Sequence, residues 1–216
     1  MKTSRTHPAL RGFTLIELLV VIAIIAILAG LLLTAGAGIR NKMIKNRAQA
    51  ELQQVALAIN AYKSKLGYYP PDNRNNYAVN SLLYELIGCT NINNSAFYPF
   101  NGFPSVSAGV LTAQTGGGIT GIMNSMRGGT SPEDGGQAVI FLKDLKPANY
   151  ADQGGLRRLG VQLDGPGNLM IGNINPFRYN SSNPTNNPTS FDLWVDIIVA
   201  GKTNRISNWG QGITPL

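Results

Sequence analysis

Residues 11–28 read RGFTLIELLVVIAIIAIL, and this stretch decides how the chain is organised. The apolar run extends from residue 13 to residue 33, and Glu17 is its one charge. About 20 apolar residues in a helix are enough to cross the hydrocarbon core of a bilayer. The stretch therefore predicts a membrane-spanning helix that contains a single carboxylate.

The junction between the basic and apolar stretches indicates where the chain is processed. A secretory signal has a shorter apolar region, of about 7–15 residues, and is cleaved after it. Here the basic stretch ends at Gly12, and the apolar run begins at once with Phe13. We therefore expect a leader of residues 1–12 that is removed, and a transmembrane helix of residues 13–34 that stays in the mature protein.

Glu17 needs an explanation, because a carboxylate within a membrane helix is costly, at about 2.5–3.5 kcal/mol on insertion scales for Asp. One interpretation is a helix-entry glutamate at the headgroup level, near the positive end of the helix dipole. The other pairs Glu17 with the α-amino group that cleavage before Phe13 would create on a neighbouring copy. That pairing would neutralise two buried charges and fix the axial register of the copies.

After the apolar run the pattern becomes amphipathic and predicts that the helix continues over residues 35–66. Apolar residues recur there at the three- and four-residue spacings of one helical face. They are Leu52, Val55, Ala56, Ile59 and Tyr62. Gly67 and Pro70 then provide the stop signal. One long helix thus has a first half that is apolar all round and a second half with a single apolar stripe.

Charge and composition also fit a membrane protein. Charged residues make up 13% of the 216, against about 25% in a typical soluble domain. The formal charge is +7, and part of it lies in the leader. Four further basic residues follow the apolar run directly: Arg40, Lys42, Lys45 and Arg47. A juxtamembrane basic cluster is typical of a solvated flank or a contact with anionic lipid, so we expect lipid and not nucleic acid as the partner.

The lone cysteine, Cys89, excludes an intrachain disulfide. His7 is the one histidine, and it lies in the leader, so no histidine base remains for a catalytic thiol. We expect Cys89 to be a small buried apolar residue. With no retained histidine, paired catalytic motif or cofactor fingerprint, the sequence does not predict an enzyme.

Residues 67–216 are expected to form a head domain. YAVNSLLYELIG, residues 77–88, predicts a short helix that ends at Gly88. Residues 91–136 are rich in Gly and Asn and are interpreted as a long surface loop. Strands are predicted in NLMIGNI, SFDLWVDIIVA and RISNW, residues 168–174, 190–200 and 205–209.

Within the strand predicted at residues 190–200, Phe191, Leu193, Val195 and Ile197 alternate with polar or aromatic residues, which indicates a strand with one covered face. The predicted fold class is α+β, with the long N-terminal helix packed on a small C-terminal antiparallel sheet.

The leader junction resembles that of type IV prepilins and type II secretion pseudopilins. In that family prepilin peptidase cuts after the glycine that matches Gly12 and then methylates the phenylalanine that matches Phe13. The family's assembly glutamate, fifth in the mature chain, matches Glu17. The resemblance implies a pilin-like fold and polymerisation through the apolar helix.

The resemblance extends to the end of the helix and to the C-terminal strands. Tyr62, Gly67, Tyr69 and Pro70 match the pattern that closes the family's helix. NPFRYNS, FDLWV and ISNW, beginning at Asn175, Phe191 and Ile206, are similar to segments of type II secretion major pseudopilins. Residues 91–136 have no counterpart.

One departure from major pseudopilins concerns their C-terminal calcium site. Ala200 and Arg205 stand where that family has calcium-binding aspartates. Calcium needs several oxygen ligands, and a cationic Arg205 would oppose it. We therefore expect no metal, with Asp192 and Asp196 as weak candidates that are interpreted as solvated carboxylates. Lys202 or Arg205 is expected to stabilise this loop instead, by pairing with carboxylates or carbonyls.

The function that follows is a structural subunit of a type II secretion-type pseudopilus, without cofactors. Its expected partners are copies of itself, prepilin peptidase, other pseudopilins, the inner-membrane assembly platform and membrane lipid. We expect a single-pass protein of the bacterial inner membrane with a periplasmic head, which then enters the filament. Two alternatives stay open: a type IV minor pilin, and a membrane-tethered monomeric binding module.

Overall fold

The computed structural model describes residues 13–93, 95–127, 138–163, 174–210 and 212–216, with residues 31–37 described by their backbone only. The expected leader of residues 1–12 lies outside the described residues. The chain divides into two compact units, Met1–Lys42 and Met43–Leu216, and each is described by itself.

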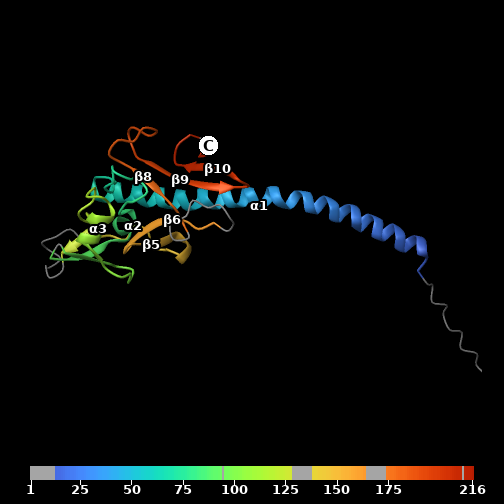
Figure 1. Cartoon of the computed structure of the whole chain (residues 1–216), viewed down its shortest axis with the longest axis horizontal. Coiled ribbons are helices and arrows are strands. Elements are labelled where there is room, and N and C mark those ends of the chain that lie inside the picture. The colour runs from blue at the N-terminus through green and yellow to red at the C-terminus, as the bar shows by residue number, and fades with distance from the viewer. Residues whose placement is uncertain (1–12, 94, 128–137, 164–173, 211) are drawn as a thin grey trace, which may run out of the picture. The chain divides into compact units, whose positions relative to one another are not determined.

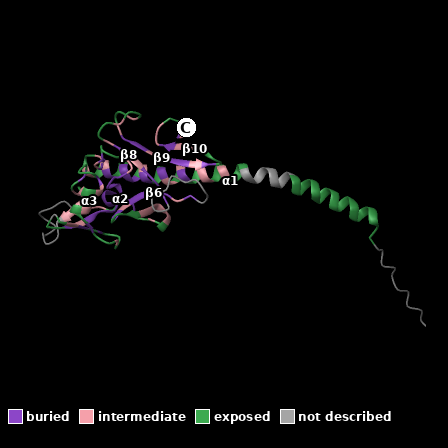
Figure 2. Ribbon diagram, viewed as in Figure 1, coloured by how far each residue is buried: buried purple, intermediate pink, exposed green. Residues whose placement is uncertain are grey.

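The longest element is helix α1, Leu15–Leu66, which confirms the long N-terminal helix (Figure 1). In the first unit its large apolar side chains from Leu15 to Leu28 are exposed (Figure 2). In the second unit the expected apolar stripe is buried, since Leu52, Ile59 and Tyr62 are all fully covered.

The end of α1 and the next helix follow their sequence signals. Gly67 has φ +88°, in the left-handed region that favours glycine after a helix. Helix α2, Leu82–Ile87, is buried at all six positions and ends at Gly88, as expected, but residues 77–81 of the predicted helix lie outside it. A Cβ at Gly88 would lie 3.1 Å from both Phe100 Cδ2 and the carbonyl oxygen of Val139, and φ there is +72°. The positive φ therefore favours glycine at this position, and a Cβ would also be tight against both neighbours.

The expected loop over residues 91–136 is wrong for the part that the structure describes. Four short strands form a sheet of order β3-β2-β1-β4, in which β1 and β4 are parallel and the other pairs antiparallel. They are β1 (Cys89–Ile92), β2 (Ala96–Pro99), β3 (Val106–Ser107) and β4 (Ser125–Arg127). Helix α3, Ala108–Gln114, follows β3, and the Ser107 hydroxyl caps it by accepting from Val110 N at 3.1 Å.

The C-terminal part contains two antiparallel sheets, which confirms the α+β class and adds a sheet that the sequence did not predict. The predicted sheet has the order β11-β10-β9-β8, and the added sheet has the order β5-β6-β7. A short 3-10 helix η1, Pro147–Asn149, precedes the added sheet. The strands are β5 (Tyr150–Gln153), β6 (Leu156–Val161), β7 (Asn175–Pro176), β8 (Arg178–Asn180), β9 (Asp192–Val199), β10 (Lys202–Ser207) and β11 (Ile213–Pro215).

Strand β9 differs from its expected one-faced pattern. Leu193, Val195 and Ile197 are fully buried, but Asp192 and Asp196 on the other face are buried too. Both faces of β9 are therefore covered. Of the strand expected at residues 168–174, residues 168–173 lie outside the described residues, and Ile174 is buried.

One hydrophobic core joins these elements within the second unit. It includes Leu52 and Ile59 of α1, Leu83 of α2, Leu156 of β6 and Val195 of β9. Figure 2 shows the buried residues concentrated where α1 runs alongside the strands of this unit. The apolar stripe of α1 therefore forms part of the hydrophobic core of the second unit.

Candidate processing and assembly site

Glu17 is held by a reciprocal capping interaction at the start of α1. Its carboxylate oxygen Oε2 accepts from both the backbone N and the hydroxyl of Thr14, each at 2.8 Å. The Thr14 hydroxyl in turn accepts from Glu17 N at 3.3 Å. This is a capping box, in which a Ser or Thr before the helix and a Glu three residues later satisfy each other's backbone N–H groups.

The capping box explains how the helix begins and leaves part of the carboxylate available. Because Thr14 and Glu17 satisfy two N–H groups at the helix start, α1 begins at Leu15 and Phe13 stays outside it. Among the described residues, the two hydrogen bonds to the carboxylate both use Oε2, which leaves Oε1 for a further donor. Gly12, the expected cleavage position, lies outside the described residues.

The carboxylate lies within an exposed apolar surface. An open groove of about 330 Å³ is lined by Phe13, Ile16, Glu17, Val20 and Val21. The side chain of Phe13 is 79% exposed. A contiguous apolar surface of this kind is typical of a membrane or protein contact.

Residues 10–33 match the model of the prokaryotic N-terminal methylation motif. This match supports a type IV pilin-like prepilin leader. This motif implies a membrane-anchored pilin-type protein that is processed by prepilin peptidase and polymerises with pilin-type subunits, and prepilin-like proteins are structural subunits. No curated protein and no solved structure matches the chain.

The described residues also allow a test for a membrane span. Among them, no helix is both long and apolar enough to qualify as a transmembrane segment. The single-pass topology expected for residues 13–34 therefore stays a proposal.

The aspartates of β9 are buried and hydrogen-bonded, so their interpretation as solvated carboxylates is wrong. Asp192 is 1% exposed and accepts hydrogen bonds from three successive backbone N–H groups of one turn. They belong to Thr185 and Asn186, at 2.9 and 3.0 Å from Oδ2, and to Asn187, at 2.9 Å from Oδ1. The carboxylate of Asp192 thus organises the turn that precedes β9.

The buried carboxylate of Asp196 forms ion pairs with two partly exposed arginines. Its Oδ1 lies 2.7 Å from Arg205 Nε, and its Oδ2 lies 3.0 Å from both Arg205 Nη2 and Arg178 Nη1. Asp196 keeps the pKa of Arg205 above its ordinary value by hydrogen bonding to the charged guanidinium. Of the two residues expected to pair here, Arg205 contacts a carboxylate, that of Asp196 directly opposite it on β9, and its stabilising role stays a prediction. Ala200, the other departure from the calcium pattern, has φ +52° in the turn between β9 and β10.

These contacts predict that calcium and chelators leave the stability of the head unchanged. The oxygens of Asp192 and Asp196 already accept from N–H donors, so a cation would have to displace them. A functional calcium site at 100 times its Kd would stabilise the folded state by about 2.7 kcal/mol. We expect no change in the thermal unfolding midpoint between EDTA and millimolar calcium, and a calcium-dependent rise would contradict this account.

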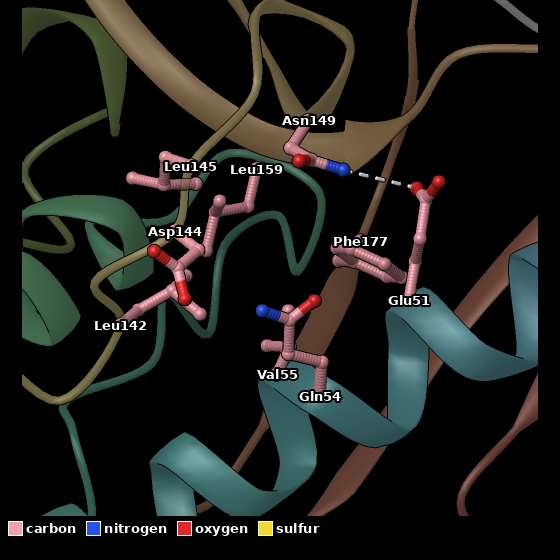
Figure 3. A pocket seen from close by; sticks show the side chains of 9 residues that line it. All are labelled: Glu51, Gln54, Val55, Leu142, Asp144, Leu145, Asn149, Leu159 and Phe177. Carbon is pink, nitrogen blue, oxygen red and sulfur yellow. Dashed lines mark hydrogen bonds between the residues drawn. The ribbon is translucent and has the colours of Figure 1, made fainter.

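A small pocket between α1 and the segment around η1 offers little space for a substrate (Figure 3). Its volume is about 10 Å³, roughly that needed for one water. Asn149 Nδ2 donates to Glu51 Oε2 across it at 3.2 Å, and Glu51 also pairs with Arg47 at 2.9 Å on its own helix. The pocket is therefore a small, mostly apolar gap between α1 and the segment around η1, crossed by one hydrogen bond.

Cys89 and Glu85 are two further buried titratable groups. Cys89 is fully buried, as expected, and burial raises the pKa of its thiol to about 12. The sequence did not single out Glu85, which is also fully buried. Its signal was a carboxylate in the middle of the apolar run LLYELI, the sequence of α2.

Proposed function

We propose that this chain is a structural subunit of a type II secretion-type pseudopilus. In this proposal residues 13–34 are held in the bacterial inner membrane with the head in the periplasm, and are later extracted into a filament. The observation that carries the proposal is the carboxylate of Glu17, which lies inside the exposed apolar groove one helical turn after the methylation junction.

The proposed assembly step follows from the geometry at the helix start. Cleavage before Phe13 creates an α-amino group one residue before Thr14 of the capping box. Glu17 Oε1 is available to accept from such an amine on a neighbouring copy while Oε2 keeps its bonds to Thr14. Pairing the two charges in an apolar environment is favourable, because each charge alone would be costly there.

The choice of a pseudopilus over an adhesive pilus is supported by the C-terminal sequence. The single buried Cys89 does not permit a disulfide-bounded C-terminal loop. The order NPF, FDLW and ISNW is similar to major pseudopilins, and these segments lie in or beside β7, β9 and β10. We propose that the Asp196–Arg205 pair takes the structural place of the metal in this head, so that no cofactor is required.

The processing step gives the first test. We expect the chain, co-expressed with a prepilin peptidase, to yield a mature protein that begins at Phe13 with one added methyl group. Mass spectrometry of the N-terminal peptide measures both changes. Gly12→Val should prevent cleavage, because a side chain at this position is expected to obstruct the peptidase.

Gly30→Ala is the matched control for this test, since a Cβ at Gly30 meets nothing within 4 Å. That variant should be cleaved and methylated like the native chain. Efficient processing of Gly12→Val before Phe13 would contradict the assigned junction. Processing followed by a permanently monomeric state would instead support a tethered binding module.

A further inference from the structure

An open cleft lies in the second unit between α1 and the segment that follows β10. Its volume is about 330 Å³, which is at the lower end of the range for small-molecule sites. One wall is a single face of α1, because its residues recur at the three- and four-residue spacings of a helix. They are Gln49, Leu52, Gln53 and Ala56.

The other wall, formed by residues 207–210 and 212, is held by hydrogen bonds within the head. Ser207 N donates to the carbonyl oxygen of Gly212 at 2.7 Å, and Gly212 N donates to that of Trp209 at 3.1 Å. The side chain of Asn208 ties this wall to β9 by accepting from Leu193 N at 2.9 Å. Trp209 is therefore presented to the cleft by a segment that is ordered without a ligand, which lowers the cost of binding one.

The side-chain amide of Gln49 lies at this cleft with an unpaired oxygen. It reaches the opposite wall, since a Cβ added at Gly212 would lie 3.0 Å from Gln49 Nε2. Gln49 Oε1 is covered from water and has no hydrogen-bond donor among the described residues. An amide oxygen in this state is costly. A ligand hydroxyl in the cleft can supply the missing donor once the terminal amide turns toward it.

The chemistry of the lining favours one class of ligand. None of the described residues that line the cleft is charged, so an ionic ligand would find no opposite charge there. An entirely apolar ligand would leave the amides of Gln49 and Gln53 without partners. A neutral sugar carries hydroxyl groups that can pair with both amides, and it has an apolar face of C–H groups that can pack on the ring of Trp209.

We propose that this cleft binds a neutral saccharide, with a sugar ring against Trp209 and sugar hydroxyls on Gln49 and Gln53. The cleft lies entirely within the second unit. The inference therefore goes beyond the proposed filament function and does not depend on it.

Tryptophan fluorescence measures binding at this cleft directly. The chain has two tryptophans, Trp209 at the cleft and Trp194, and their ring centroids are 5.7 Å apart. The full chain, in a detergent without a sugar headgroup, is titrated with maltotriose, cellotriose and the trimer of N-acetylglucosamine. We expect a saturable change in emission with at least one of these sugars, with a Kd of about 1 mM or tighter.

Three glutamine variants locate the bound sugar. Gln49→Ala and Gln53→Ala should each weaken binding about two- to tenfold, because each loses a hydrogen bond to the ligand. Gln54→Ala is the matched control, since Gln54 follows Gln53 on α1 but lines the small pocket near η1 instead (Figure 3). It should bind the sugar like the native chain. Gln53 and Gln54 are exposed, so their replacement should leave the fold unchanged, which circular dichroism checks.

Two results would overturn the saccharide site. One is the absence of a saturable change in emission with all three sugars. The other is equal affinity for the sugar in the native chain, Gln49→Ala and Gln53→Ala, which would place the sugar elsewhere. Emission that responds to the concentration of the chain and not to any sugar belongs to the first result, and would assign the cleft to a second copy.

Discussion

Replacing Glu17 by Ala is expected to reduce incorporation into filaments at least about tenfold, while membrane insertion is retained. Losing the proposed pair with a neighbouring α-amino group leaves that amine uncompensated in apolar surroundings. Even about 1.4 kcal/mol of lost interaction per contact corresponds to a tenfold change in association. Insertion should persist, because removing a carboxylate from an apolar helix makes insertion more favourable. Sheared filament fractions, compared with membrane fractions by quantitative immunoblotting, measure both quantities.

A second variant separates the two roles of Glu17. Gln can replace Glu in a capping box, so Glu17→Gln should keep the bonds to Thr14 and still fail to assemble. Thr14→Ala is the complementary variant, because it removes the hydroxyl from the capping box and keeps the charge of Glu17. If Glu17→Gln is incorporated into filaments in the same amount as the native chain, Glu17 serves only as a helix cap. That result would contradict the proposed pairing.

Asp196→Ala should destabilise the head by about 3 kcal/mol. Removing one member of a buried ion pair typically costs about 3–5 kcal/mol, because a charge is left without its partner. A loss at the lower end of this energy range is expected for Asp196→Ala. The reason is that the side chains of Arg178 and Arg205 are 29% and 34% exposed and can reach water. For a chain of this size the thermal midpoint should fall by about 10 °C.

Asp152→Ala is the matched control for Asp196→Ala. Asp152 lies 3.9 Å from Arg157 and its side chain is 51% exposed. Exposed pairs of this kind contribute about 0–1 kcal/mol, so the midpoint should change little. Equal losses in the two variants would contradict the structural role assigned to Asp196. The comparison uses thermal unfolding followed by circular dichroism.

The sequence predicted those features that depend on neighbouring residues. The apolar run and the 3.6-residue stripe predict α1 to within two residues, and Gly67 and Gly88 end their helices because each adopts a positive φ. The capping box is also a local feature, since Thr14 and Glu17 have the required spacing in the sequence.

The features that were missed depend on distant partners. Strand β1 pairs Cys89 with Ser125 in parallel and with Pro99 in antiparallel fashion. Strands of two to four residues separated by Gly and Asn look like loops until these partners are known. The burial of Asp196 likewise depends on Arg178, which reaches it from β8. The contact of Glu85 with Tyr62 joins two helices and has no local signature.

We propose that copies of this chain polymerise through their N-terminal helices with Glu17 shared between copies. Cryo-electron microscopy of filaments formed by the processed, methylated chain tests it most directly. We expect helical filaments in which Glu17 of one copy lies within hydrogen-bonding distance of the Phe13 amine of another. Processed chains that stay monomeric, or filaments in which Glu17 contacts only its own Thr14, would contradict it.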